Sequence, residues 1–473
     1  MNYVFYDLET TGRSSAWDQI IQIAAIKTDQ HLNIKEKFEE KCRISASCIP
    51  NPEAILVNKI SIRTLLSTNL SHYQLMINLQ KKFTEWSPAI FIGYNSIKFD
   101  EEFLRSSFFK SLLYPYITIK EQNYRFDLLD SIRAVNHLHP DRIKSLISEK
   151  GNPILKLDQI APLNGISDFK AHDALGDTIA TLGLAKIIKK KSPSIWKDTI
   201  SNKTKSYLLS YISNKPFCYI ESVFGRIKLF TLSFIGEHPY YKWAICFDLN
   251  KDPSEILNLS DDAFKSYLEQ TPKIIKNIKL NKSPLFLSLE YVSSIKTEND
   301  LTNKEITDRN KFIQDNPSLK KRIINYYEKK ASGTISDYNQ ADIFAEESIY
   351  KKFASDKDTK LMQEFHLSTW EDRNIIKNKF SDERLTYFAN MLIYEENPEY
   401  LEKTTIKSIR RSLSDRLLSH NDEKWLTLYN AYKKIDDLRE KCDNERDNLS
   451  LKALEEINEY LEKTEKQLQM YKD

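Results

Sequence analysis

The stretch YDLETTG, residues 6–12, places two acidic side chains at the end of an apolar run that is typical of a buried β-strand. Successive side chains of a strand point to opposite faces, so Asp7 and Glu9 share one face and repel each other. A divalent cation would remove this repulsion, because Mg²⁺ prefers carboxylate, water and phosphate oxygens as ligands. On this pair alone, two ordinary acids at a strand end are the simpler interpretation.

The composition is that of a globular protein with about three domains of roughly 100–200 residues each. The 473 residues are 29% charged and 41% hydrophobic, and the formal net charge is only +3. The total charge therefore does not indicate a nucleic-acid partner, and any basic surface must be local. The five cysteines form no CxxC pair, which argues against a thiolate zinc site or a disulfide framework and favours a cytoplasmic protein. We find no signal sequence and no run of about 18 apolar residues, so we expect no membrane segment.

Three segments with different patterns predict three domains. Residues 1–194 alternate strand-like and helix-like patterns, which predicts an α/β domain that ends where SPS (192–194) breaks a long helix. Residues 195–333 contain short aromatic-rich β-type runs and a few helical patterns, which predict a small barrel or open sheet. Residues 334–473 are almost entirely helical in pattern. The segment ASGTISDYN (331–339) is predicted to be a linker.

Acidic residues also occur at the start of two predicted helices. Asp100 follows a strand-like run in GYNSIKFDEEF, where an ordinary helix N-cap is the alternative interpretation. In AHDALGD, His172 precedes a long helix, Asp173 is interpreted as a helix-start residue, and Asp177 lies one turn later. Small neighbours of Asp177 would let this helix approach a strand with Asp177 facing it.

In this order, Asp7-x-Glu9, Asp100 and His172-x4-Asp177 resemble the D-E-D-D class of 3′→5′ exonucleases, in the variant with a histidine five residues before the last aspartate. Five stretches resemble the bacterial exonuclease I family in particular: YDLETTG, GYNSIKFDEEFLR, YRFDLLDSIRA, LKLDQIAPLNGI and AHDALGDTIATLGLAK. The resemblance covers the whole chain. It implies an α/β fold in which an RNase H-like exonuclease domain is followed by an SH3-like β-barrel domain and an all-α C-terminal domain.

The resemblance implies an exodeoxyribonuclease that degrades single-stranded DNA from the 3′ end, releases 5′-mononucleotides and serves DNA repair and recombination. Asp7, Glu9 and Asp177 would hold one of two Mg²⁺ ions, with Mn²⁺ as an alternative metal. Asp7 would bridge to the second ion, and Asp100 would act directly or through water. Two such ions, about 4 Å apart, stabilise the attacking and the leaving oxygen. His172 would be the general base, a task that suits an imidazole at neutral pH.

The resemblance further implies contacts with the DNA strand, in which cations follow phosphates and aromatic rings stack on bases. In the first domain these contacts come from Glu9, Arg105, Tyr116, Arg133 and Lys156. Lys156 occupies a position where the family usually has arginine. A lysine can still contact a phosphate, but it cannot form the bidentate contact of an arginine. In the later domains they come from Lys205, Trp243, Lys276 and Asn281, with Phe344 as a further stacking candidate. For Trp243 and Phe344 a core position is an equal alternative.

Partners and competing functions stay open at this point. Family members dock the acidic tail of single-stranded DNA-binding protein, and here only Lys215 resembles a docking residue, so tail docking is in doubt. One alternative function is an exonuclease that prefers RNA or short oligonucleotides, because sequence does not settle sugar preference. Another is a non-catalytic single-stranded DNA-binding clamp, against which the complete set of acids argues. We expect a monomer in the cytoplasm.

Overall fold

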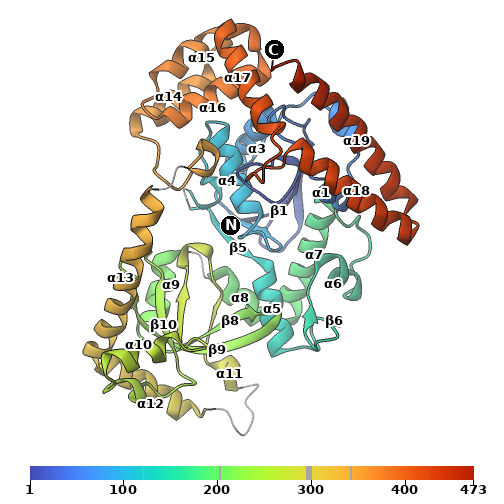
Figure 1. Cartoon of the computed structure of the whole chain (residues 1–473). Helices are drawn as coiled ribbons and strands as arrows, with labels where there is room; N and C mark the ends of the chain where they lie inside the picture. Colours follow the sequence, from blue (N-terminus) through green and yellow to red (C-terminus); the bar gives the residue numbers. More distant parts are fainter. Residues whose placement is uncertain (121, 202–203, 294–300, 341–342, 473) are drawn as a thin grey trace. The chain divides into compact units, whose positions relative to one another are not determined.

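The computed structural model describes residues 1–120, 122–201, 204–293, 301–340 and 343–472 (Figure 1). The chain divides into two compact units, and each unit is assembled from segments that are distant in sequence. The first unit contains residues 1–123, 169–179 and 343–473, and the second contains residues 124–168 and 180–342. The domain boundaries expected at 194/195 and 333/334 follow pattern changes along the sequence, and they stay a prediction.

A sheet forms the centre of the first unit. Its strands β1 (Asn2–Thr10), β2 (Ile20–Thr28), β3 (Ile34–Lys41) and β4 (Ala89–Gly93) lie in the order β3-β2-β1-β4. β1 runs antiparallel to β2 and parallel to β4, and its last partner on β4 is Ile92, opposite Phe5. Asp7 and Glu9 therefore extend past the paired part of β4. This leaves space for other elements beside the two acids at the carboxyl ends of the parallel strands.

Helices cover this sheet because they carry apolar residues at helical spacing. The helices in the N-terminal part of the unit are α1 (Pro52–Asn58), α2 (Ile62–Ser67), α3 (His72–Trp86), α4 (Asp100–Lys110) and the first turns of α7 (Ala174–Lys191). Leu75, Leu79 and Phe83 of α3 pack with Phe91 of β4 and Phe108 of α4 in one core. A capping box at Ser71 fixes the start of α3.

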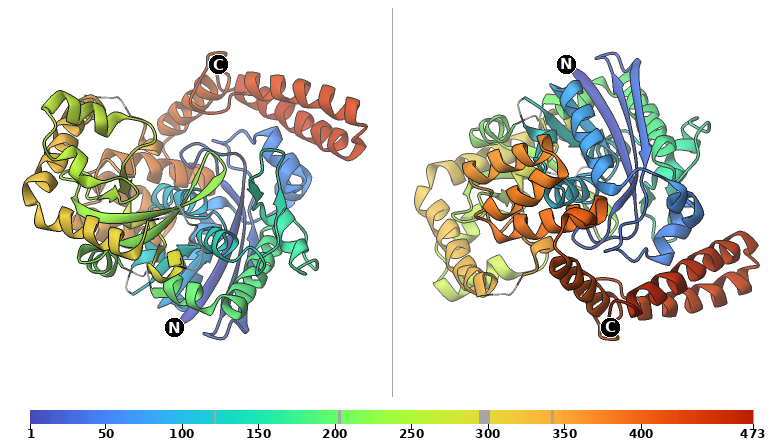
Figure 2. Two further views of the ribbon diagram at one scale, coloured as in Figure 1. Left: turned by 90° about the horizontal axis from the view of Figure 1, so that it is seen from below. Right: turned by 90° about the horizontal axis from the view of Figure 1, so that it is seen from above.

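The C-terminal part of the first unit is all helical, as the sequence predicts. Its helices are α14 (Asp356–Leu367), α15 (Trp370–Ile376), α16 (Glu383–Glu396), α17 (Lys403–Leu417), α18 (Leu428–Glu445) and α19 (Asn448–Gln469). α18 and α19 lie side by side as an antiparallel pair (Figure 2). Buried side chains such as Phe388 and Leu461 join Ile21, Leu65 and Phe109 in one hydrophobic core. The first and last parts of the sequence therefore stabilise each other.

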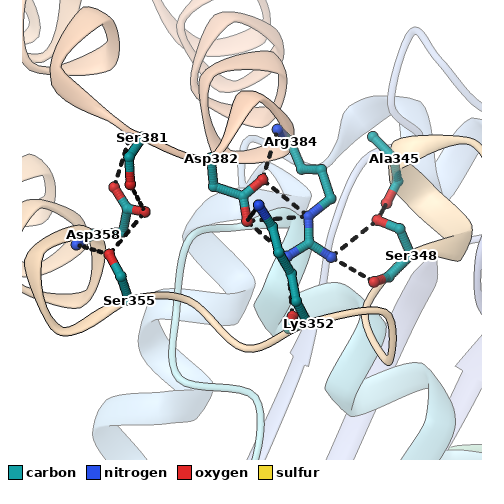
Figure 3. Close-up of polar contacts among 8 residues, drawn as sticks. All are labelled: Ala345, Ser348, Lys352, Ser355, Asp358, Ser381, Asp382 and Arg384. Carbon is teal, nitrogen blue, oxygen red and sulfur yellow. Dashed lines mark hydrogen bonds and ion pairs between the residues drawn. The ribbon is translucent and has the colours of Figure 1, made fainter.

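An arginine holds the irregular segment that leads into these helices (Figure 3). The Arg384 guanidinium donates to the carbonyl oxygens of Ser348 (2.5 Å) and Lys352 (3.0 Å), and it pairs with Asp382 at 2.7 Å. The pattern of SIYKKFASDKDTKLMQEF (348–365) predicts a helix, and this prediction is wrong for residues 348–355, because α14 begins only at Asp356. The carbonyls that Arg384 binds take no part in a helix.

The second unit combines a small sheet with helices. Its strands β8 (Phe217–Val223), β9 (Arg226–Glu237), β10 (Ala244–Asp248), β11 (Ile275–Ile278) and β12 (Phe286–Leu287) pair in the order β11-β10-β9-β8-β12. All four pairings are antiparallel. The shorter strands are β5 (Tyr124–Asp127), β6 (Leu146–Ile147) and β7 (Pro153–Ile154), of which β6 and β7 pair with each other. This sheet is the β-rich segment that the sequence predicts between residues 195 and 333.

The helices of the second unit cover this sheet and lead to and from it. They are α5 (Leu128–Leu138), α6 (Leu157–Leu163), the rest of α7, α8 (Pro193–Ser201), α9 (Lys205–Ser213), α10 (Asp261–Glu269), α11 (Glu290–Ser293), α12 (Asn303–Asp315) and α13 (Pro317–Gln340). The prediction of a linker at residues 331–339 is wrong, because α13 continues through this segment. A single glycine costs a helix only about 1 kcal/mol, which a long helix tolerates. No helix in the described ranges is long and apolar enough to cross a membrane.

Candidate active site

Three carboxylates from two elements meet at the end of β1. Ligand oxygens of Asp7, Glu9 and Asp177 all lie within 4.8 Å of one another, and all three side chains are half-buried. The first two come from β1, where the alternation of the strand gives them one face, and the third comes from the first turn of α7. The structure therefore brings together acids that are about 170 residues apart in the sequence.

Small residues let α7 approach the sheet this closely. The fully buried Thr178 hydroxyl lies 3.3 Å from the carbonyl oxygen of Ala24 on β2 and donates to Ala174 within the helix at 2.7 Å. Gly176 faces the preceding segment, where a Cβ atom would lie only 2.0 Å from the carbonyl oxygen of Lys170. As the small neighbours in the sequence predict, Asp177 faces the strand that carries the other two acids.

Burial and mutual repulsion make this cluster unfavourable for bare charges. Burial raises the pKa of Asp7 well above its ordinary value, and the neighbouring Asp100, Glu9 and Asp177 raise it further. The pKa of Glu9 is raised to about 8, mainly by burial and to a smaller extent by the charges of Asp177 and Asp100. Asp100 is the buried first residue of α4, so it belongs to the same electrostatic group. Such a set of oxygen donors fits a divalent cation, which would neutralise the repulsion.

The segment before α7 is held in a specific conformation. Asp173 accepts a hydrogen bond from the Gly176 backbone (3.3 Å) and one from the Gln22 side chain (3.1 Å), in keeping with its interpretation as a helix-start residue. His172 is half-buried and has a left-handed backbone with φ of 61°, which is uncommon for a residue other than glycine. Its role as general base stays a prediction.

Three consecutive parts of the chain match known families. Residues 4–185 match the family described as Exonuclease, residues 201–329 the Exonuclease I SH3-like domain, and residues 344–464 the Exonuclease I C-terminal domain. The chain belongs to the exonuclease I family. The predicted family and the predicted series of exonuclease, SH3-like and C-terminal domains are thereby confirmed.

Known members of the exonuclease I family align with almost the whole chain. Exodeoxyribonuclease I of Escherichia coli (strain K12) is 27% identical over 431 residues, which cover 85% of this chain and 88% of the relative. Exodeoxyribonuclease I of Buchnera aphidicola subsp. Schizaphis graminum (strain Sg) is 28% identical over 430 residues, which cover 85% and 86%.

Solved structures of exonuclease I share the fold. The structure of exonuclease I from Methylocaldum szegediense aligns with a TM-score of 0.83 at 21% identity. The structure of E. coli exonuclease I in complex with a dA16 oligonucleotide aligns with a TM-score of 0.81 at 22% identity. Both alignments cover 98% of this chain and 99% of the other.

The candidates for DNA contact in the first unit range from buried to exposed. Arg105 is 6% exposed, lies 3.9 Å from Glu101 and places its guanidinium 5.1 Å from the ring centre of the half-buried Tyr116. Phe344 is 47% exposed, and its ring packs edge-on against that of Trp17, with ring centres 5.4 Å apart. The DNA contacts of Arg105, Tyr116 and Phe344 stay predictions. To bind a phosphate, Arg105 would have to do so beside Glu101 and Tyr116 or give up these contacts.

The cationic candidates in the second unit mostly pair with acids. The pairs are Arg133 with Asp130 (2.7 Å), Lys205 with Glu237 (2.5 Å) and Lys276 with Glu221 (2.9 Å). Lys156 instead occupies the N-cap position of α6. A phosphate that approaches the paired residues would compete with a carboxylate for each of them. Their role in binding DNA stays a prediction.

The remaining candidates in the second unit lie in aromatic or loop surroundings. The Trp243 ring stacks on Tyr241 with ring centres 4.6 Å apart, and it is half-buried. Asn281 is exposed, and its backbone carbonyl accepts from Arg125 at 3.1 Å. Lys215 lies 4.6 Å from the ring centre of Tyr211. The predictions for these three residues are likewise untested.

One residue near the site was missed in the sequence. The Tyr350 hydroxyl lies 2.5 Å from a carboxylate oxygen of Glu102 and 3.4 Å from the Arg105 guanidinium. Both partners belong to α4, the helix that begins with Asp100. The run YKKF (350–353), two aromatics around two lysines, was a signal for a surface with affinity for nucleic acid, but it was included in a predicted helix.

Proposed function

We propose that this chain is a metal-dependent exodeoxyribonuclease that removes nucleotides from the 3′ end of single-stranded DNA. The observation that carries the proposal is the cluster of Asp7, Glu9 and Asp177, with Asp100 beside it, in a member of the exonuclease I family. A protein that only bound DNA would gain nothing from placing several acids where a phosphate must lie. E. coli exonuclease I, a relative with the same fold, has been solved in complex with dA16 and dT13 oligonucleotides.

Each acidic residue has a role in this proposal. Asp7, Glu9 and Asp177 would hold a divalent cation, which supplies positive charge beside the scissile phosphate and lowers the pKa of water. Asp100, at the start of α4, would complete the set for a second ion. His172, just before α7, would accept the proton of the attacking water. The donors are all oxygens, which favours Mg²⁺ over softer metals, although a zinc-bound form of the E. coli exonuclease I complex has been solved.

The same proposal assigns the strand contacts and the setting of the reaction. We assign phosphate contacts and base stacking to Arg105, Tyr116, Arg133, Lys156, Lys205, Trp243, Lys276 and Asn281. The proposal also includes docking of the single-stranded DNA-binding protein tail through Lys215, a monomeric state, a cytoplasmic location and a role in DNA repair. The salt dependence of DNA binding measures how many DNA phosphates the lysine and arginine side chains neutralise.

Single-stranded DNA labelled at either end tests the reaction. With Mg²⁺, we expect 3′-labelled DNA to release labelled mononucleotide at once and 5′-labelled DNA to shorten step by step. EDTA should stop both reactions. Activity that EDTA leaves unchanged, or release of the 5′ label first, would contradict the proposal. Faster degradation of RNA of the same sequence would favour the RNA alternative, and binding without cleavage would favour the clamp.

A further inference from the structure

The loop that follows the catalytic strand is unusually long for a hairpin connection. β1 ends at Thr10 and β2 begins at Ile20, whereas hairpin loops usually have two to five residues. The register between the strands shifts at Glu9 and Thr10, directly beside the candidate metal ligand. Residues 11–19, which we call the hairpin loop, therefore set where the end of β1 lies. A loop of this length can fix the end of β1 only if contacts with other residues restrict the loop itself.

Asp18 organises this loop from within. Its carboxylate accepts a hydrogen bond from the Ser14 backbone at 2.8 Å and one from the Thr11 hydroxyl at 3.2 Å. Gly12 packs on the same carboxylate, since a Cβ atom there would lie 2.4 Å from its oxygens. The Thr11 hydroxyl also accepts from the Gln19 backbone at 3.0 Å, which closes the base of the loop. These contacts connect the first residues of the loop with its last two.

Lys110 binds the loop from outside. It is the last residue of α4, and its ammonium donates to the carbonyl oxygens of Ala16 (3.1 Å), Ser15 (3.3 Å) and Asp18 (3.4 Å). Among the described residues this ammonium forms no ion pair within 4.0 Å, and the carboxylates of Asp18 and Glu346 act on it from farther away. The side chain enters a cavity of about 90 Å³ that Trp17 and Asp18 also line. The half-buried ammonium of Lys110 thus donates hydrogen bonds to three backbone carbonyls of the hairpin loop.

Residues of the C-terminal part of the same unit contact the tip of the loop. The Trp17 ring lies 4.9 Å from that of Trp425 and 5.4 Å from that of Phe344, measured between ring centres. The Arg416 guanidinium lies 5.5 Å from the centre of the Trp17 ring. Aromatic and cation–π contacts of this kind restrict the tip of the loop. The loop is therefore held both by α4 and by Phe344, Arg416 and Trp425 of the C-terminal part of the unit.

We propose that Lys110 is a positioning residue for the metal cluster, an inference that rests on the proposed function. The helix α4 carries Asp100 at its first position and Lys110 at its last, about 15 Å apart along a rigid element. It thereby fixes the Asp100 side of the cluster directly and the Glu9 side through the hairpin loop. Positioning of this kind matters because a displacement of about 1 Å at a catalytic group can cost up to about 100-fold in rate.

The substitution Lys110→Met tests this inference, because it removes the three donors and keeps most of the side-chain volume. We expect the Mg²⁺ concentration for half-maximal activity to rise about tenfold and kcat to fall about tenfold, at the lower end of the range seen when residues that support metal ligands are removed. KM for DNA should change less than twofold. Independently of activity, hydrogen exchange of a peptide covering residues 11–18 should become faster, and calorimetry should show weaker Mg²⁺ binding.

The exposed Lys81 on α3 gives a matched control, since Lys81→Met makes the same change outside the cavity and should leave all these values unchanged. If Lys110→Met does not fold, Lys110→Gln serves instead, because its shorter side chain cannot reach the three carbonyls. A variant with a wild-type Mg²⁺ requirement and unchanged hydrogen exchange would overturn the inference. A merely structural role would lower the amount of folded enzyme without a change in Mg²⁺ requirement, and this outcome would overturn it too. If the wild type itself needs no metal, the proposed function fails instead.

Discussion

Replacing Glu9 by glutamine should stabilise the metal-free protein at alkaline pH. In the folded chain the pKa of Glu9 is raised to about 8 from an ordinary value of 4.5, by burial and by the acids beside it. The folded state therefore binds more protons than the unfolded state between these two values, and its stability falls as the pH rises through this window. Glutamine has no charge to lose, so the variant lacks this dependence.

The size of the effect follows from the shift. One pKa unit corresponds to about 1.4 kcal/mol, so Glu9 costs the metal-free wild type about 4 kcal/mol of unfolding free energy between pH 5 and pH 8. An unfolding entropy of about 2.1 cal/mol/K per residue gives about 1 kcal/mol/K for 473 residues that unfold together. The melting temperature of Glu9→Gln relative to wild type should therefore rise by about 4 °C over this pH range.

Calorimetry in EDTA at pH 5 and pH 8, repeated with Mg²⁺, measures this difference. Mg²⁺ competes with protons for the carboxylates, so it should stabilise the wild type more at pH 8 than at pH 5, and Glu9→Gln less than the wild type at both values. A difference in melting temperature that does not depend on pH would refute the reasoning. So would a metal-free variant that is less stable than wild type at pH 8, because the acids would then not repel each other.

Two substitutions on α7 test the other side of the cluster. Asp177→Asn should lower single-turnover cleavage about 100-fold or more and leave binding of single-stranded DNA in EDTA, measured by fluorescence anisotropy, within about twofold. Cleavage at the wild-type rate would remove this residue from the ligand set. Gly176→Ala should lower both melting temperature and activity, although alanine normally favours a helix by about 1 kcal/mol, because its Cβ would lie 2.0 Å from the Lys170 carbonyl and displace the segment that carries His172. Gly183→Ala in the same helix is the control, since its Cβ would meet side-chain atoms of Ile166 at 2.8 to 3.2 Å and no backbone atom among the three nearest. Equal effects of the two changes would contradict the explanation.

Local rules predicted how each acid is oriented, and the resemblance to the exonuclease I family predicted that the acids meet. The alternation of a strand places Asp7 and Glu9 on one face whatever the rest of the chain does. The small residues around Asp177 indicate a close approach to a strand, and the hydroxyl of Thr178 beside β2 is the contact that allows it. Asp100 could be assigned to a helix start from its acidic first turn. The orientation of each acid depends on its sequence neighbours, whereas the meeting of β1 with α7 depends on residues about 170 positions apart.

Features that depend on distant residues could not be predicted. The segment 348–355 has a helical pattern, but Arg384, about 30 residues later, binds its carbonyls in an irregular conformation. Lys110 has the sequence features of an ordinary cation at a helix C-terminus, and only the folded loop supplies the three carbonyls that it binds. The acids that pair with Arg133, Lys205 and Lys276 include Glu237 and Glu221, which are 32 and 55 residues away. No periodicity encodes such pairs.

The composition of the first unit also constrains how the protein is made. Its hydrophobic core needs residues 343–473, which the ribosome adds only after about 220 intervening residues of mostly second-unit sequence. At about 5 to 20 residues per second, this delay lasts roughly 10 to 45 seconds. During that time the nascent N-terminal segment exposes apolar side chains such as Leu65 and Phe109, whose partners on the later helices do not yet exist. A nuclease built in this way completes its core only late in synthesis, and its early segment is a natural client for chaperones.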